Sequence, residues 1–440
     1  MLGSVIRNAM VAVLCLGASV ARAGGPLLPV QGVRSLERAG ALVAGAEDAD
    51  SLWTNPAGLA RLRAGRAGKR ALLFDAAYVY QTVDVVALDG TASSNLQPGH
   101  GIPGLAGALG LGDRLVLAGG LTAPYDTVHR YATDDTTGTL TFVVTAGVGY
   151  AVSDRLRVGA TIQNHVTRTR RSLTTLACTG DPCDATDASL AMRLDIAQTD
   201  YLAPAGSLGV QLDVTPYVTL GALVQSPVRV AGQGTLTVQL PTAMQFASAR
   251  VTGDRVAYEY ARPPIVRAGV ELRPRADLRV EAALSVELWS AVGAVTIAPD
   301  GVQLEDIAGG PFPLGEMQEP RSYDTSFAPS IAVEWHGDGV MLGAGYAYET
   351  AAVPSDQVAI STAIDAGKHV LGAGGGYEAY GWQIGGAVGV ALLADVAVPA
   401  TAAAVVPLAP LRAPTTTSPG NAGRYESRYI VGGLRFARRF

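Results

Sequence analysis

The sequence predicts an all-β protein, a transmembrane antiparallel β-barrel of about fourteen strands. Three observations support this fold class. The chain opens with a secretory leader, it is strongly apolar without containing a membrane-spanning helix, and long segments alternate apolar and polar residues with the period of a β-strand.

Residues 1–23 have the three parts of a signal peptide. Arg7 supplies the positive charge, Met10 to Val20 is a short apolar core, and Ala21 to Ala23 offers small residues for cleavage. A membrane anchor would need roughly 20 apolar residues. We therefore expect the mature protein to be secreted and to begin near Gly24.

Apolar residues make up 48% of the chain and the mean hydropathy is +0.24, but this apolarity is spread along the sequence. The apolar stretch from Val388 to Leu411 is interrupted by Asp395 and by three prolines. A closed barrel explains the composition, because it satisfies its backbone polar groups between strands and needs no spanning helix. With a formal net charge of -5 and no basic patch, we expect no nucleic-acid partner.

Period-2 alternation is clearest in residues 277–289. The even positions, among them Val280 and Leu284, are apolar, whereas the odd positions include Glu281 and Glu287. A segment of about a dozen residues is long enough to cross a bilayer when tilted. In a soluble sandwich the apolar face would be core; in a membrane barrel it faces lipid and the polar face lines the lumen.

Short turns and long polar connections alternate along the chain, as in outer-membrane barrels with periplasmic turns and external loops. The expected strands, about fourteen in number, are residues 71–81, 104–112, 114–123, 139–152, 155–167, 190–213, 217–230, 264–273, 277–290, 323–336, 339–350, 367–379, 381–396 and 425–440.

The tetrapeptide Asn55-Pro56-Ala57-Gly58 lies ahead of the first expected strand. Alone it predicts no more than a turn, because Pro fixes its own φ and excludes the preceding residue from the α region. Here it follows Glu47-Asp48-Ala49 by a short spacer, behind a leader and before a barrel pattern. This arrangement resembles the N-terminal hatch of Gram-negative outer-membrane transporters for long-chain fatty acids and aromatic hydrocarbons, the FadL and TodX type.

The resemblance extends into the barrel. The segment from Arg262-Pro263-Pro264 to Trp289-Ser290 is similar to the family's mid-barrel hairpin, Gly343 to Glu349 is similar to a later hairpin, and Tyr425 to Phe440 is similar to the last strand. An aromatic content of 6% is low for an interfacial girdle and is the main departure from the family pattern.

This resemblance implies a signal peptide at 1–23, a hatch at 24–68 and an outer-membrane barrel at 69–440. It also implies passive uptake of hydrophobic compounds, with Asn55, Pro56, Ala57 and Gly58 in a hatch that rearranges and a sideways exit through the wall. The alternative is a structural or receptor barrel without transport. A hatch favours the transporter, because a plug has no use in a purely structural barrel.

The segment from Ala118 to Pro124 is the candidate for the lateral opening. The paired glycines Gly119 and Gly120 leave a thin wall, and Pro124 cannot donate to the ladder. An ordinary strand end is the competing interpretation.

The C-terminal Phe440 shares a strand face with Phe436, Leu434 and Ile430, although Arg438 interrupts the apolar stripe. This pattern is typical of the signal that barrel assembly machinery reads, and a chance terminal aromatic is the alternative. The other expected partners are a hydrophobic small-molecule ligand and outer-membrane lipid and lipopolysaccharide. We expect a monomer.

Cys178 and Cys183 enclose four residues of a polar loop. Their spacing is compatible with a local disulfide in an oxidising compartment, and two unpaired thiols are the alternative. A metal site is disfavoured, since no His or second Cys pair lies nearby in the sequence.

Catalytic motifs are missing from the sequence: it contains no Gly-x-Ser-x-Gly, His-Glu-x-x-His or phosphate loop. The five histidines are scattered without ligand spacing, so we expect no enzyme activity, cofactor or metal. Glu281 and Glu287 with Arg279 are expected to neutralise one another along the lumen wall. The sequence does not identify the ligand-binding residues.

Overall fold

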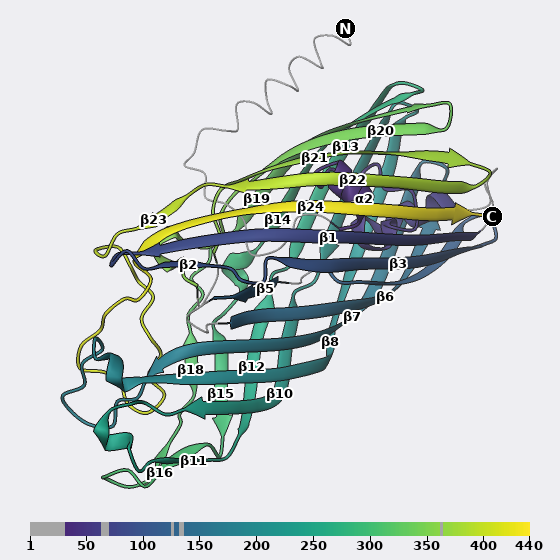
Figure 1. The fold of residues 1–440 in the computed structure, drawn as a ribbon. Coiled ribbons are helices and arrows are strands. Elements are labelled where there is room, and N and C mark those ends of the chain that lie inside the picture. The colour runs from purple at the N-terminus through teal and green to yellow at the C-terminus, as the bar shows by residue number, and fades with distance from the viewer. Residues whose placement is uncertain (1–30, 63–69, 125–126, 132–135, 361–363) are drawn as a thin grey trace.

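The computed structural model describes residues 31–62, 70–124, 127–131, 136–360 and 364–440, so the expected leader at 1–23 lies outside the described residues. In the described part of the chain, fourteen antiparallel strands form a closed barrel, which confirms the predicted fold class (Figure 1). The barrel strands are β1 (Arg70–Ala87), β3 (Gly99–Leu111), β4 (Leu115–Thr122), β6 (Thr136–Ala151), β7 (Leu156–Leu176), β8 (Ala191–Thr215), β9 (Val218–Gln225), β13 (Ile265–Arg275), β14 (Leu278–Glu287), β19 (Ser326–Gly337), β20 (Val340–Glu349), β21 (Lys368–Ala379), β22 (Trp382–Leu393) and β24 (Gly423–Arg439).

The first and last strands close the barrel. β1 and β24 pair without interruption from Ala71 opposite Arg439 to Ala87 opposite Gly423. This seam leaves no free edge between the first and last strands, and it satisfies backbone polar groups that lipid cannot. Among the described residues no helix has the length and apolarity needed to cross a membrane.

The predicted alternation is confirmed. On β14, Leu284 is 40% exposed on the outer face, whereas Glu281 is fully buried and faces inward. The outer surface carries a belt of exposed apolar side chains that includes Leu72, Leu208 and Leu434. Lipid would cover this belt in a membrane, so its exposure is expected of a transmembrane barrel.

Several strands run further than predicted at the end with the long loops. β1 runs to Ala87 and β7 to Leu176, beyond the predicted ends at 81 and 167, whereas β8 begins at Ala191, within one residue of its prediction. β7 and β8 pair across charged positions such as Arg170 and Arg171. Sequence alternation of apolar residues stops at the membrane boundary, but backbone pairing does not depend on it, so the ladder continues outside.

The wall also continues outward through further strands, which are separated from the barrel strands by prolines that interrupt the hydrogen-bonded ladder. Ser226-Pro227 separates β9 from β10, and Pro263-Pro264 separates β12 from β13, because Pro cannot donate to the ladder. The outer extension comprises β10 (Val228–Gln239), β12 (Arg255–Arg262), β15 (Val295–Asp300) and β18 (Met317–Glu319), with a small sheet of β11 (Arg250–Thr252), β16 (Gln303–Glu305) and β17 (Phe312–Pro313). A large apolar cluster is buried beneath it.

Short elements complete the loop side. They are β2 (Ala92–Ser94), β5 (Thr127–Arg130), β23 (Val396–Val398), η2 (Ala188–Leu190), η3 (Met244–Phe246), η4 (Trp289–Ala291) and η5 (Ser355–Gln357). The last long connection reaches across to the extension, where the amide of Leu176 donates to the carbonyl of Leu408 and that of Gly315 donates to Pro410.

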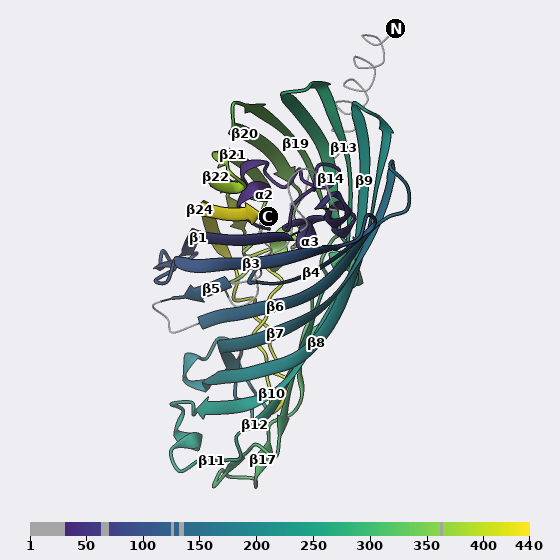
Figure 2. The same ribbon diagram turned by 90° about the vertical axis from the view of Figure 1, so that its right-hand side faces the viewer.

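The hatch occupies the inside of the barrel toward the end with the short turns (Figure 2). Its described part contains α2 (Val33–Glu37), α3 (Ser51–Thr54) and η1 (Pro56–Leu62), and nearly every residue of these elements is buried. The N-terminal segment therefore plugs the lumen, as the sequence predicted.

Deletion of Phe440 is expected to lower the yield of folded barrel. The amide and carbonyl of Phe440 bond those of Arg70 and form the last pair of the seam between β24 and β1. Heat-modifiability on gels, compared with an unaltered chain expressed in parallel, measures the folded fraction. An unchanged folded fraction would show that neither this pair nor the terminal aromatic assists assembly.

Candidate functional site

The hatch turn is built around the Asn55 side chain. Its Nδ2 donates to the carbonyl of Val43 at 2.9 Å and to that of Val210 in the wall at 3.3 Å, while its Oδ1 accepts from the amide of Ala57 at 3.2 Å. Asn55 has an extended backbone, as expected before Pro56, and it ends α3 where η1 begins. One side chain thus bonds both the hatch and the barrel.

Two wall glycines allow this turn to lie directly on the barrel. A Cβ on Gly159 of β7 would be 2.2 Å from the Pro56 carbonyl carbon, and one on Gly209 of β8 would be 2.1 Å from Asn55 Oδ1. Only glycine permits such a close backbone approach. Neither glycine was predicted from the sequence as part of the site, although each occupies an inward position of its alternating strand.

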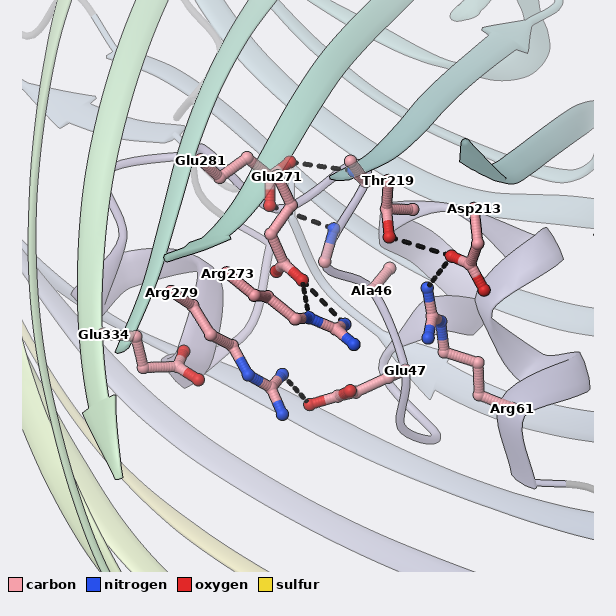
Figure 3. A network of polar contacts seen from close by, with 12 residues as sticks. Ala46, Glu47, Arg61, Asp213, Thr219, Glu271, Arg273, Arg279, Glu281 and Glu334 are labelled. Carbon is pink, nitrogen blue, oxygen red and sulfur yellow. Dashed lines mark hydrogen bonds and ion pairs between the residues drawn. The ribbon is translucent and has the colours of Figure 1, made fainter. Parts of the chain in front are cut away.

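Residues 43–46 of the hatch are held by two wall side chains, Glu281 of β14 and Gln211 of β8, and we name this arrangement the backbone clamp. Figure 3 shows the Glu281 side chain against the hatch backbone. The Glu281 carboxylate accepts from the consecutive amides of residues 43, 44 and 45 at 2.7, 2.8 and 3.0 Å. Gln211 Nε2 donates to the carbonyls of residues 43, 44 and 46 at 3.3, 3.0 and 2.8 Å. The clamp therefore satisfies a stretch of hatch backbone that has no secondary structure.

Buried arginines of the hatch link the clamp to a second wall carboxylate. Arg38 pairs with Glu281 at 2.7 Å and with Glu334 at 3.0 Å, and Arg34 pairs with Glu334 at 3.0 Å. Arg34 also bonds Glu47 within the hatch at 3.1 Å. Both arginines are almost fully buried, so each needs the compensation that these carboxylates give.

Acidic residues of the hatch bind the wall at β24, on the side of the plug away from the backbone clamp. Arg435 of β24 pairs with Asp48 at 2.8 Å, with Asp50 at 3.0 Å and with Asp75 at 3.5 Å. Burial would raise the pKa of Asp48, but the guanidiniums of Arg439 and Arg435 outweigh it and lower that pKa to about 2. Asp48 is therefore ionised at neutral pH and binds the wall as an anion.

Glu47 completes this set of contacts. Burial would raise its pKa, yet Arg279 of the wall and Arg34 of the hatch hold the pKa of Glu47 well below its usual range. The expectation that Glu281, Glu287 and Arg279 neutralise one another along the wall is wrong. Arg279 pairs with Glu47 and Glu281 binds the hatch, because these inward positions face a plug instead of an open lumen.

Glu37 on α2 differs from Glu47 and Asp48, because its neutral form is the favoured one. Burial, with the nearby Glu334 adding to it, raises the pKa of Glu37 to about 7, despite the opposing influence of Arg34, Arg38 and Arg435. The buried Glu37 carboxyl holds its proton more tightly than a solvated carboxyl with a pKa of 4.5. Its contribution to holding α2 in the barrel is therefore complete below about pH 4.5 and is lost progressively as the pH rises to about 7.

The candidate opening residues lie beside the hatch. Gly119 and Gly120 are fully paired with β3 and β6, and a Cβ on Gly120 would be 2.9 Å from a methyl group of Leu52 in the hatch. The β4 ladder ends at Thr122, and Pro124 is buried just beyond it.

Beyond Thr122 the described residues show no direct pairing that joins β3 to the next element. β3 continues to Gly99 with β1 alone as its partner, while β5 resumes at Thr127 and pairs only with β6. A narrow cavity with about 20 Å³ of water-accessible space lies between the hatch and this part of the wall, lined by Gly32, Leu36, Asp75, Ala77, Ile102, Pro103, Gly104, Thr122 and Val431.

The remaining candidates lie away from the hatch. Cys178 and Cys183 are joined as a disulfide with Cα atoms 5.7 Å apart, buried in the apolar cluster of the outer extension. Among the described residues no group of three His, Cys, Asp or Glu side chains is arranged to hold a metal. Histidines instead bond polar neighbours; for example, His129 contacts Gln81 at 2.7 Å, and His165 contacts Arg262 at 3.3 Å.

Replacing Glu281 by Gln is expected to loosen the hatch by about 3 kcal/mol, because it removes the buried anion that holds three amides and Arg38. Limited proteolysis of folded barrel in detergent should then cut the hatch faster. Glu259→Gln is the matched control, since Glu259 forms only an exposed pair with Arg229. Equal cleavage of both variants would contradict the clamp.

The chain matches the family model of outer membrane protein transport proteins (OMPP1/FadL/TodX) over residues 14–422. A comparison with curated protein sequences gave no match.

Solved structures share the fold at low sequence identity. A FadL homologue from Pseudomonas aeruginosa is similar with a TM-score of 0.74 and 14% identity, covering 96% of this chain and 100% of its own. The toluene transporter TodX of P. putida has a TM-score of 0.66, 15% identity and coverage of 94% and 99%. The toluene transporter TbuX of Ralstonia pickettii has a TM-score of 0.64, 16% identity and coverage of 94% and 99%.

The family model covers most of the chain, and the plugged barrel agrees with it. This protein is therefore located in the Gram-negative outer membrane and belongs to the outer membrane protein transport family of OMPP1, FadL and TodX.

Proposed function

We propose that the chain takes up hydrophobic small molecules, long-chain fatty acids or aromatic hydrocarbons, passively across the outer membrane. The observation that carries this proposal is a plug seated by noncovalent contacts inside a closed barrel. Related structures support the cargo class, since they are described as toluene transporters and a monoaromatic hydrocarbon channel.

Lateral release is the proposed exit. The cavity between α2 and the wall lies where pairing between β3 and β4 ends, at Gly104 opposite Thr122. In the seated state its space is on the order of one water molecule. Movement of the hatch away from the wall would enlarge this cavity and let a hydrophobe leave sideways near Gly119, Gly120 and Pro124.

The remaining partner assignments are proposals of the same kind. The exposed apolar belt suits outer-membrane lipid and lipopolysaccharide, and the terminal Phe440 suits recognition by barrel assembly machinery. The continuous seam between β1 and β24 lets one chain close the barrel without a second copy, consistent with a monomer. Transport needs no catalytic step, cofactor or nucleic acid.

The alternative is a structural or receptor barrel. The ordered outer extension and its buried apolar cluster favour it, because they present a firm surface outside the membrane. The clamp and the ion pairs argue against it, since a wall that binds its plug at several points is suited to holding a gate.

Asn55→Ala is expected to reduce uptake of a labelled aromatic hydrocarbon or long-chain fatty acid several-fold while the barrel assembles normally. The change removes bonds to hatch and wall backbone, worth about 1–3 kcal/mol, and frees the turn from Val210. Pro56→Ala should act in the same direction by loosening the turn.

The matched control is Asn164→Ala. Asn164 donates to the carbonyl of Tyr201 on the outside of the wall, and no hydrogen bond joins it to the described part of the hatch. Heat-modifiability and uptake are measured on the same cells. Normal uptake by both hatch variants, with the unaltered protein active, would reduce the motif to a structural turn and favour the structural barrel.

A further inference from the structure

A second small pocket lies between the hatch and the opposite wall. The hatch contributes Ala39, Gly40 and Val43, at the turn that follows α2, and the wall contributes residues of β13, β14, β19 and β20. Its water-accessible space is about 20 Å³, room for a single water-sized group. We name it the carboxylate pocket for the two buried glutamates that line it, Glu287 and Glu349.

Both glutamates are well buried, at 7% exposure for Glu287 and 2% for Glu349. Glu349 Oε1 binds the Lys368 ammonium at 3.0 Å, and Glu287 Oε2 accepts from Trp289 Nε1 at 2.8 Å. Glu349 Oε2 is buried and has no hydrogen-bond partner among the described residues. A buried acceptor without a partner is costly, and a ligand that brings a donor recovers that cost.

The charges around the pocket disfavour an anionic ligand. Lys368 is already paired with Glu349 and also faces Asp365. Arg267 lines the pocket and lies within electrostatic reach of Glu287. Two cations thus face three carboxylates, so the buried charge around the pocket is already net negative and a further carboxylate would add to it.

The rest of the lining suits a hydroxyl group. Ser285, Ser326 and Ser330 supply small polar side chains, and Ala39 and Val43 supply an apolar edge toward the hatch. One hydroxyl fits the available volume, but an aromatic ring or an acyl chain does not. The apolar part of such a ligand would lie outside the pocket.

Resting on the proposed uptake function, we propose that the carboxylate pocket binds the hydroxyl of an uncharged hydrophobe, with Glu349 as acceptor. The preferred cargo of this chain is then a phenol or alcohol instead of a free carboxylic acid. The pocket adjoins the turn of α2, so an occupant would contact the hatch directly.

The test compares three ligands of one shape, p-cresol, toluene and 4-methylbenzoate, by equilibrium binding to folded full-length protein in detergent at pH 8. We expect p-cresol to bind about tenfold more tightly than toluene, and 4-methylbenzoate to bind most weakly. Glu349→Gln should bring the p-cresol to toluene ratio close to one and reduce the discrimination against 4-methylbenzoate. Glu259→Gln, an exposed site, should leave all three affinities unchanged.

If Glu349→Gln does not fold as a heat-modifiable barrel, Ser326→Ala serves instead and should lower the p-cresol to toluene ratio a few-fold. Tighter binding of 4-methylbenzoate than of p-cresol would overturn the inference and leave the uptake function standing. Equal affinity for p-cresol and toluene, or a ratio that the pocket variants do not change, would also overturn it. Failure of all three ligands to bind the unaltered protein would overturn the uptake function as well.

Discussion

The plug depends on one kind of interaction, in which side chains of the barrel wall satisfy the backbone of an irregular hatch. A segment without regular secondary structure cannot be buried unless its amides and carbonyls find partners. Glu281 and Gln211 supply them for residues 43–46, and Asn55 supplies them for the hatch turn. The inward polar face of the strands, which could have lined a water-filled pore, here serves as a binding surface for the chain's own N-terminal segment.

Charge compensation follows from the same burial. Arg34 and Arg435 lie in the interior beside carboxylates from both hatch and wall, and Arg38 lies beside carboxylates of the wall. Such networks give little net stability, but breaking one partner is expensive, so they fix the position of the plug more than they strengthen the barrel. The charge of Glu37 is not fully compensated, so the position of α2 is sensitive to pH. In the carboxylate pocket a buried acceptor lacks a donor, so this site is the one most responsive to a ligand.

Much of the barrel could be predicted from sequence, because the lipid and the lumen impose opposite polarities on alternate residues. That pattern located β14 and β24 within a few residues, yet it could not place the outer ends of β1 and β7, where no lipid selects the side chains. The Asn-Pro-Ala turn was visible as a local motif. The wall residues that contact this turn could not be predicted, since Gly159 and Gly209 lie against it only in the folded barrel.

Native-state hydrogen exchange at the hatch tests the clamp most directly. In folded barrel, the amides of Val43, Ala44 and Gly45 should exchange about a hundredfold more slowly than those of the exposed turn around Gly90, because each donates to a buried carboxylate. Protection that persists when toluene is added would mean that the clamp holds while other parts of the hatch move. Exchange of these three amides as fast as the exposed turn would show that the wall does not hold the hatch in this way, and would contradict the account.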